Sequence, residues 1–157
     1  MSNVRTLLAA TFLLAFSGAI HAGETLAPDV EALLHSVRAN KRAPVSVNLP
    51  LTDEEAEKFW PVYERYQKEL AGVQDRLAKM IEDYTAHFAK LSDEDGARLV
   101  RDYLAIEADR VKIRQAYVGP LSEAIPGRKV ARFYQIENKM DAVLRYGLAR
   151  LIPVIEE

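Results

Sequence analysis

Apolar side chains recur every seven residues in two interleaved series between Leu51 and Leu91. The first series is Phe59, Tyr66, Val73 and Met80, with His87 next, and the second is Tyr63, Leu70, Leu77, Tyr84 and Leu91. Spacings that alternate between four and three residues place both series on one stripe of an α-helix that faces another helix. We therefore expect one helix over 53–90, roughly 57 Å long at about 1.5 Å per residue, in an elongated all-α fold.

Two helix starts repeat the same arrangement of residues. Each has a leucine, then a hydroxyl residue, then an acidic residue three positions later: Leu51, Thr52 and Glu55 in the first, and Leu91, Ser92 and Asp95 in the second. The hydroxyl accepts a hydrogen bond from a free backbone N–H, and the acidic residue completes a capping box. Thr52 is predicted to cap the long helix, and Ser92 to cap a helix that runs from about Asp93 to Glu123.

A further long helix is predicted from about Arg128 to Ile152, because an apolar stripe follows the turn at 125–127 and ends before Pro153. Short connections place consecutive helices antiparallel. The expected architecture is therefore a pair of elongated antiparallel helical hairpins built from three long helices.

The stripes also set a register between these helices. It places Tyr66 opposite Tyr117 and the charged residue Arg110 opposite the charged residue Glu137. Both charges interrupt otherwise apolar stripes, so we expect them to form an ion pair at the seam. The alternative is that each side chain reaches water separately.

The N-terminal residues 1–22 are expected to be a secretory signal peptide. Arg5 precedes an apolar run from Leu7 to Ile20 that is shorter than the about 20 residues needed to span a bilayer. Cleavage is expected near Ala22, which implies a periplasmic mature chain without stable membrane insertion. The alternative is an uncleaved anchor.

Residues 23–50 are predicted to form a short helix and an extended arm before the helical domain, residues 51–157. The helix would begin at Pro28 and run to about Val37. The segment from Val45 to Pro50 alternates like a strand but is bounded by Pro44 and Pro50, which favours an arm.

The charge balance argues against nucleic-acid binding. The chain has 21 basic and 23 acidic residues and no cysteine. Cleavage after Ala22 would remove one basic residue, Arg5, and leave 20 against 23, a formal charge of −3. Nucleic-acid binding requires a basic face, and the absence of cysteine excludes disulfides, thiolate metal sites and a lipid-anchored lipoprotein.

The sequence offers little catalytic chemistry. It has no nucleophile elbow and no glycine-rich loop after a strand. Its carboxylates lie on expected solvated helix faces. His87 and Asp83 lie one turn apart and are a candidate metal pair, but a partly buried histidine near a helix end is the favoured interpretation. We expect a non-enzymatic protein without cofactor or metal.

Tyrosines are frequent on the predicted stripes. Those residues, with three basic residues near them, form the candidate partner-binding face: Tyr63, Tyr66, Tyr84, Tyr103, Tyr117, Arg128, Lys129 and Arg132. One interpretation is that the tyrosines edge a thin core and satisfy their hydroxyls at its rim. The other is an amphipathic face that holds unfolded segments weakly.

With its expected signal peptide, its all-helical cysteine-free chain and its two Leu-Thr/Ser-x-x-acid helix starts, the sequence resembles the periplasmic Spy/CpxP superfamily with LTxxQ repeats. The resemblance covers about residues 50–152. Glu55 and Asp95 stand where that family has glutamine. The resemblance implies a homodimer and an ATP-independent chaperone or envelope-stress modulator that binds unfolded or envelope proteins. The alternatives are a periplasmic metal-responsive regulator and a structural, self-associating envelope protein.

Overall fold

The computed structural model describes residues 32, 35–36, 39 and 41–155. Within these residues the chain forms helices joined by short connections and no strands, so the all-α prediction is confirmed. The predicted signal peptide and most of the helix predicted between Pro28 and Val37 lie outside the described residues.

The longest helix, α3, spans Asp53–His87 and is followed by a single 3₁₀ turn, Phe88–Lys90. Its start is a complete capping box. The N–H of Glu55 donates to Thr52 Oγ1 at 3.3 Å, and the N–H of Thr52 donates to Glu55 Oε2 at 2.8 Å. These bonds satisfy two backbone donors that would otherwise lack partners at the helix start. The predicted long helix and its cap are confirmed.

The helix predicted over 93–123 is two helices, α4 at Asp93–Ala116 and α5 at Val118–Ala124. Ser92 caps α4 as predicted, because its hydroxyl accepts from the N–H of Asp95 at 3.2 Å. Pro120 accounts for the break. It has no N–H to donate to the carbonyl of Ala116, four residues earlier, and its ring crowds that carbonyl.

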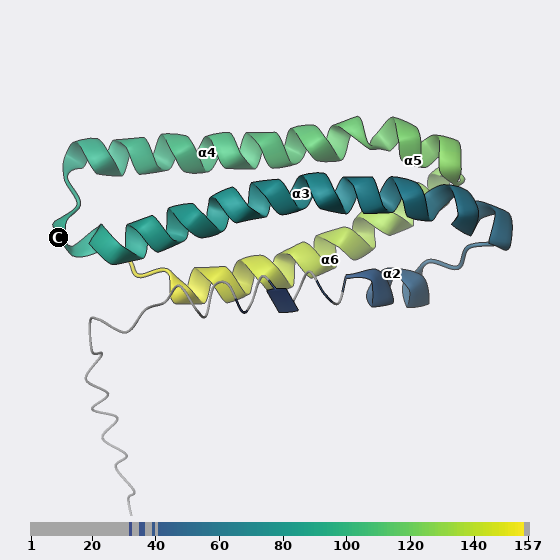
Figure 1. Cartoon of the computed structure of the whole chain (residues 1–157), viewed down its shortest axis with the longest axis horizontal. Helices are drawn as coiled ribbons and strands as arrows, with labels where there is room; N and C mark the ends of the chain where they lie inside the picture. The colour runs from purple at the N-terminus through teal and green to yellow at the C-terminus, as the bar shows by residue number, and fades with distance from the viewer. Residues whose placement is uncertain (1–31, 33–34, 37–38, 40, 156–157) are drawn as a thin grey trace, which may run out of the picture.

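Helices α3 and α4 form an antiparallel hairpin, and Figure 1 shows them side by side along the length of the molecule. The connection over residues 88–92 is short, which turns the second helix back along the first. The rings of Tyr66 and Tyr117 lie 5.3 Å apart between centroids. The register predicted for this hairpin is therefore confirmed at the end far from the connection.

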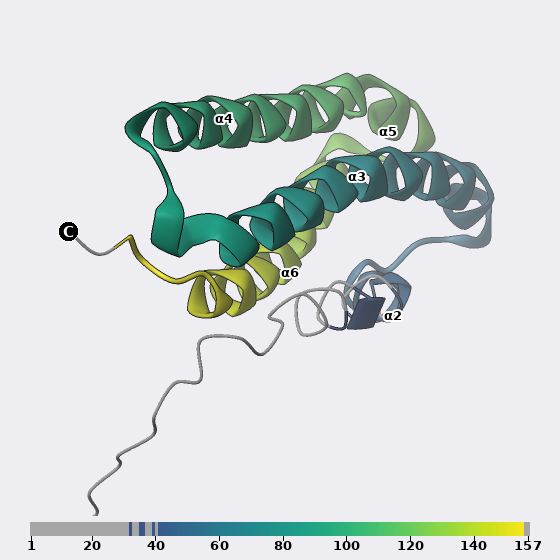
Figure 2. The same ribbon diagram turned by 60° about the vertical axis from the view of Figure 1, so that its left-hand side comes forward.

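The last helix, α6, spans Gly127–Leu151 and packs its apolar face on α3 (Figures 1 and 2). Phe133 lies 5.4 Å from Phe59 between ring centroids, and further along both helices Gln67 donates to Glu137 at 3.0 Å. Residue numbers rise together along the two helices, so they are parallel. The turn at 125–126 carries the chain across the start of α3, which is why α6 lies against α3 rather than only against α4.

The predicted ion pair between Arg110 and Glu137 is wrong. Arg110 instead pairs with Asp141 at 2.9 Å and with Glu107 at 3.1 Å. Glu137 lies 3.8 Å from the ammonium of Lys41. Contacts between α4 and α6 are shifted by about one helical turn from the predicted register, because the prediction treated α4 and α5 as one straight helix.

The predicted extended arm is also wrong, because Arg42–Asn48 forms helix α2. Val45 and Leu49 are buried, whereas Val47 between them is 81% exposed. Apolar contacts four residues apart fit a helix, although alternate apolar residues suggested a strand. Pro44 lies in the first turn, where a missing N–H costs little.

The core has two parts along the bundle. An aromatic cluster at the α5 end joins α2, α3, α5 and α6, and its largest fully buried members are Phe59, Tyr66 and Phe133. A smaller aliphatic cluster of Ile81, Leu144 and Leu148 joins α3 to α6 at the other end. Helix α4 contributes one buried residue, Ile106, so it is the least covered of the long helices.

Candidate functional site

The tyrosines of the predicted partner-binding face do not form an open surface. Four of them are at most 8% exposed: Tyr63, Tyr66, Tyr84 and Tyr117. Burial raises the pKa of Tyr63 and of Tyr66 above the ordinary value, since an ionised ring is poorly solvated there. Of the five tyrosines, only Tyr103 is exposed, at 39%. The arrangement matches the first interpretation, in which these rings belong to a thin core.

The tyrosine hydroxyls differ in their partners. Tyr84 Oη donates to the carbonyl of Pro153 at 2.7 Å, and Tyr117 Oη donates to Glu69 Oε1 at 2.7 Å. The hydroxyls of Tyr63 and Tyr66 are buried without a hydrogen-bond partner in the described part of the chain. A buried unpaired hydroxyl costs stability, so these two rings stay in place through packing.

The predicted basic residues serve the fold at the start of α6. Lys129 pairs with Glu55 at 2.5 Å, and this hydrogen bond lowers the pKa of the Glu55 carboxyl. Arg132 Nε donates to the carbonyl of Asn48 at 2.6 Å, which ties α6 to the end of α2. Arg128 is exposed. Lys129 and Arg132 therefore join helix ends rather than surround the tyrosines.

An open groove of about 660 Å³ lies instead between the second half of α3 and the first half of α4. Figure 2 shows these helices separating toward the 88–92 connection. Apolar side chains from both helices and from the connection between them line the groove: Met80, Tyr84, Leu91, Leu99 and Ile106. Of these, Met80, Leu91 and Leu99 are only half-buried, so the groove presents apolar surface to solvent.

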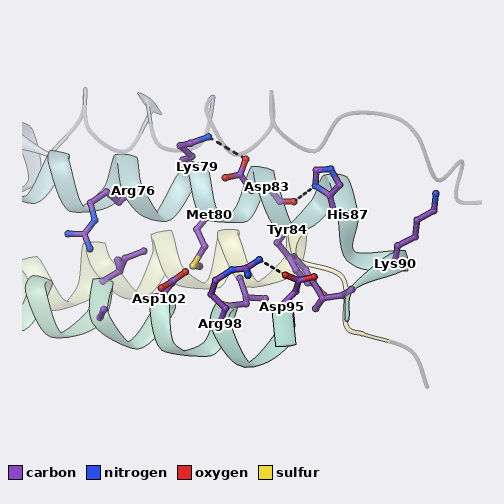
Figure 3. A pocket seen from close by; sticks show the side chains of 14 residues that line it. Arg76, Lys79, Met80, Asp83, Tyr84, His87, Lys90, Asp95, Arg98 and Asp102 are labelled. Carbon is purple, nitrogen blue, oxygen red and sulfur yellow. Dashed lines mark hydrogen bonds and ion pairs between the residues drawn. The ribbon is translucent and has the colours of Figure 1, made fainter. Parts of the chain in front are cut away.

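Charged residues of both signs surround this lining (Figure 3). On the α3 side, Lys79 pairs with Asp83 at 3.3 Å, and His87 Nδ1 lies 2.9 Å from the backbone carbonyl of Asp83. On the α4 side, Arg98 pairs with Asp95, and hydrogen bonds from Ser92 and Arg98 lower the pKa of that carboxyl. The rim therefore carries charge pairs rather than a single sign.

The two predicted helix-start motifs lie at opposite ends of α3. Leu91 lines the groove, and Ser92 donates to Asp95 Oδ2 at 2.7 Å beside it. Leu51 packs against the aromatic cluster at the other end, next to Thr52. Each motif caps a helix, and only the second contributes to the groove.

The candidate metal pair is not assembled. The carboxylate of Asp83 faces Lys79, and His87 Nδ1 lies against the backbone carbonyl of Asp83 instead of its carboxylate. Across the described residues, no group of three or more histidine, aspartate or glutamate side chains is placed to hold a metal ion. None of the described helices is both long and apolar enough to span a membrane.

A second apolar surface was missed in the sequence. Val100, Leu104 and Val111 are 57%, 58% and 45% exposed on the side of α4 away from α3. Their spacings of four and seven residues place them on one face. The inward stripe through Ile106 and Ile113 hid this pattern, since α4 has apolar residues on two faces. Counting matches to both stripes separately would have found it.

Comparisons with known proteins give no assignment: no protein-family model, no curated protein and no solved structure matches this chain. The resemblance to the Spy/CpxP superfamily therefore stays a prediction, and the groove and the exposed helix faces are interpreted from their own chemistry.

Proposed function

We propose that this chain is a non-enzymatic helical protein that binds apolar segments of partly unfolded or partner proteins in the groove between α3 and α4. The observation that carries the proposal is the apolar lining of Met80, Leu91 and Leu99, half-exposed in a groove of about 660 Å³. That size lies within the roughly 300–1,000 Å³ of typical ligand clefts. Accessible apolar surface in a concave site marks a binding site more often than a chance feature.

The rim suits weak binding with little sequence preference. Most of its charges are already paired within the chain, as in Lys79 with Asp83 and Arg98 with Asp95. An incoming segment would gain mainly from burial of apolar surface, which is non-directional. Methionine adds an adaptable contact, because its unbranched side chain fits many shapes.

The proposal includes a place in the cell and a class. Cleavage of residues 1–22 would deliver the mature chain to the periplasm, where a binding protein works without nucleotide. An ATP-independent chaperone or envelope-stress modulator of the Spy/CpxP type is the class that agrees with the resemblance and with the groove.

The test is suppression of aggregation of a denatured client by the purified mature chain without ATP. Ala105 is exposed and lines the groove from α4, so Ala105→Glu places a charge there without disturbing the core. Ala142 is exposed on α6, away from the groove, and Ala142→Glu is the matched control. We expect suppression by the natural chain and by the control, and its loss in Ala105→Glu.

Two results would count against the proposal. One is no suppression at several-fold molar excess of the natural chain. The other is equal suppression by both variants, which would move client binding away from the groove. Circular dichroism of each variant verifies that the helices are intact.

A further inference from the structure

The outward face of α6 carries basic side chains and no exposed carboxylate. Helix α6 has six basic and two acidic residues, and both acids point inward. Glu137 is 4% exposed. Asp141 is half-buried and pairs with Arg110 and Arg145. Lys129 pairs with a carboxylate at the start of α3. The other four basic residues of the helix are all exposed: Arg128, Arg132, Lys139 and Arg150.

These four cations lie on one straight stripe. Together with one tyrosine, they follow one another at spacings of four, seven, seven and four residues: Arg128, Arg132, Lys139, Tyr146 and Arg150. Such spacings place all five side chains on one face of an α-helix. At about 1.5 Å per residue the stripe is about 33 Å long. Figure 1 shows the second half of α6 along the edge of the molecule opposite α4.

The positive charge of this stripe is not compensated by carboxylates of the described residues. Arg132 Nε donates to the carbonyl of Asn48, which is neutral. The guanidinium carbon of Arg150 lies 5.9 Å from the ring centroid of Tyr146, a contact that leaves the charge in place. Helices α3 and α4 instead expose residues of both signs. Basic charge is therefore concentrated on α6, in a chain whose net charge is −2.

Apolar surface lies within the basic stripe. Val143 and Tyr146 are 67% and 69% exposed, and both lie between Lys139 and Arg150 in the sequence. Tyrosine has an apolar ring and a polar hydroxyl, which suits it to the boundary between water and acyl chains. Lysine and arginine lay their aliphatic stems along apolar surface and keep their charges in the polar layer. The face therefore combines the two kinds of contact that a lipid headgroup region offers.

We propose that the outward face of α6 binds the surface of an anionic lipid bilayer, with the helix parallel to that surface. The four cations contact lipid phosphates, while Val143 and Tyr146 enter the headgroup region. Binding is peripheral, because the opposite face of α6 packs in the core. A nucleic acid offers the same negative charge but no apolar layer for Val143, so the exposed residues favour lipid.

This binding goes beyond the proposed capture of clients, because it uses a different part of the molecule. No residue of α6 lines the groove between α3 and α4. One chain can therefore use both surfaces at once, and each surface can be altered without the other.

Co-sedimentation with lipid vesicles tests the proposal. The protein used is residues 23–157, which contain every described residue and lack the apolar run expected to be a signal peptide. The vesicles contain phosphatidylglycerol and phosphatidylcholine in equal parts, and phosphatidylcholine alone gives the baseline. We expect at least about tenfold stronger binding to the anionic vesicles, since each basic residue near such a surface adds about fivefold. Salt at about 1 M should abolish the difference, because it shortens the screening length to about 3 Å.

Paired charge reversals locate the binding face. Lys139→Glu with Arg150→Glu should weaken binding to the anionic vesicles by at least about 25-fold, from about fivefold for each cation lost. Arg101→Glu with Lys112→Glu is the matched control. It changes the net charge equally on exposed residues of α4 and should alter binding by less than about threefold. Circular dichroism verifies that the helices are intact in both.

A neutral substitution separates lipid from other polyanions. Tyr146→Ser keeps the charge of the stripe and should weaken vesicle binding by about fivefold, because burial of the ring is lost. Binding of Tyr146→Ser equal to that of the natural chain would overturn the proposal. Binding of the natural chain to double-stranded DNA as tightly as to anionic vesicles would also overturn it and assign the face to a nucleic acid.

Two further results would overturn the proposal: equal binding to anionic and neutral vesicles, and equal binding by the two paired charge reversals. The outcome is independent of client capture. The groove variant Ala105→Glu should leave vesicle binding unchanged, and Lys139→Glu with Arg150→Glu should leave suppression of aggregation unchanged.

Discussion

Phe133→Ala is the substitution that tests most directly how α6 packs on α3. Phe133 is 0% exposed, and its ring centroid lies 5.4 Å from that of Phe59, 6.0 Å from that of Tyr63 and 5.8 Å from that of Tyr66. Its ring thus contacts several α3 rings at once. Truncation to alanine leaves a void that these large rings fill poorly.

The expected decrease in stability follows from this packing. Burying alanine in place of a core phenylalanine costs about 3–5 kcal/mol, and each aromatic pair adds about 0.5–1.5 kcal/mol beyond area burial. Because the substitution removes several aromatic pairs at once, we expect a decrease near the upper end, about 4–5 kcal/mol. A domain has roughly 5–15 kcal/mol of stability in total, so the variant should be only marginally folded.

Urea unfolding followed by fluorescence measures this decrease. Trp60 is the single tryptophan, and it lies in the same cluster, 5.1 Å from Phe59 and 5.3 Å from Tyr63 between ring centroids. With a slope of about 2 kcal/mol per molar urea, the midpoint should fall by roughly 2 M. The matched control on the same helix is Val143→Ala, 67% exposed, which should change stability by less than about 0.5 kcal/mol. Similar midpoints for the two variants would refute the parallel packing of α6 on α3.

Three further predictions use the same assay. Tyr66→Phe removes an unpartnered hydroxyl and should be neutral or slightly stabilising, whereas Tyr84→Phe loses the bond to the Pro153 carbonyl and should cost about 1 kcal/mol; the opposite order would contradict the assigned contacts. Thr52→Ala removes the cap of α3 and should cost about 1 kcal/mol, so an unchanged midpoint would mean that the cap is replaced by water. Burial raises the pKa of Glu137 above 4.5. Its contribution to the free energy of unfolding is therefore greatest below that pH and falls as pH rises through the folded pKa. Glu137→Gln should flatten this fall as pH rises above 4.5, and equal slopes of stability against pH in both chains would count against a buried, costly carboxylate.

Heptad spacing and caps were enough to predict α3. Its apolar face repeats along most of its length, and Thr52 with Glu55 marks its start with a local hydrogen-bond pattern that needs no tertiary context. The ring contact between Tyr66 and Tyr117 was predictable too, because a short connection fixes the register of an antiparallel pair.

Elements that depend on tertiary placement were not predictable in the same way. Val45 and Leu49 satisfy both a strand and a helix pattern, and only the core that they contact decides between them. Arg110 was assigned to the right interface but the wrong acid, since the break before α5 shifts α4 against α6 by about a turn. The groove was missed because half-exposed Met80 and Leu99 have the same spacing as core residues.

Most buried side chains lie at the α5 end of the molecule, so local stability differs along its length. The aromatic end ties four helices together, whereas the first half of α4 has no buried side chain, and Ile106, the one buried residue of that helix, lies just beyond it. Local opening should therefore cost least around residues 93–105, and amide exchange there should be faster than in α3 or α6. A molecule bound in the groove beside residues 93–105 would slow their amide exchange. Binding would then be detectable as a loss of local motion in α4, even if the average structure hardly changes.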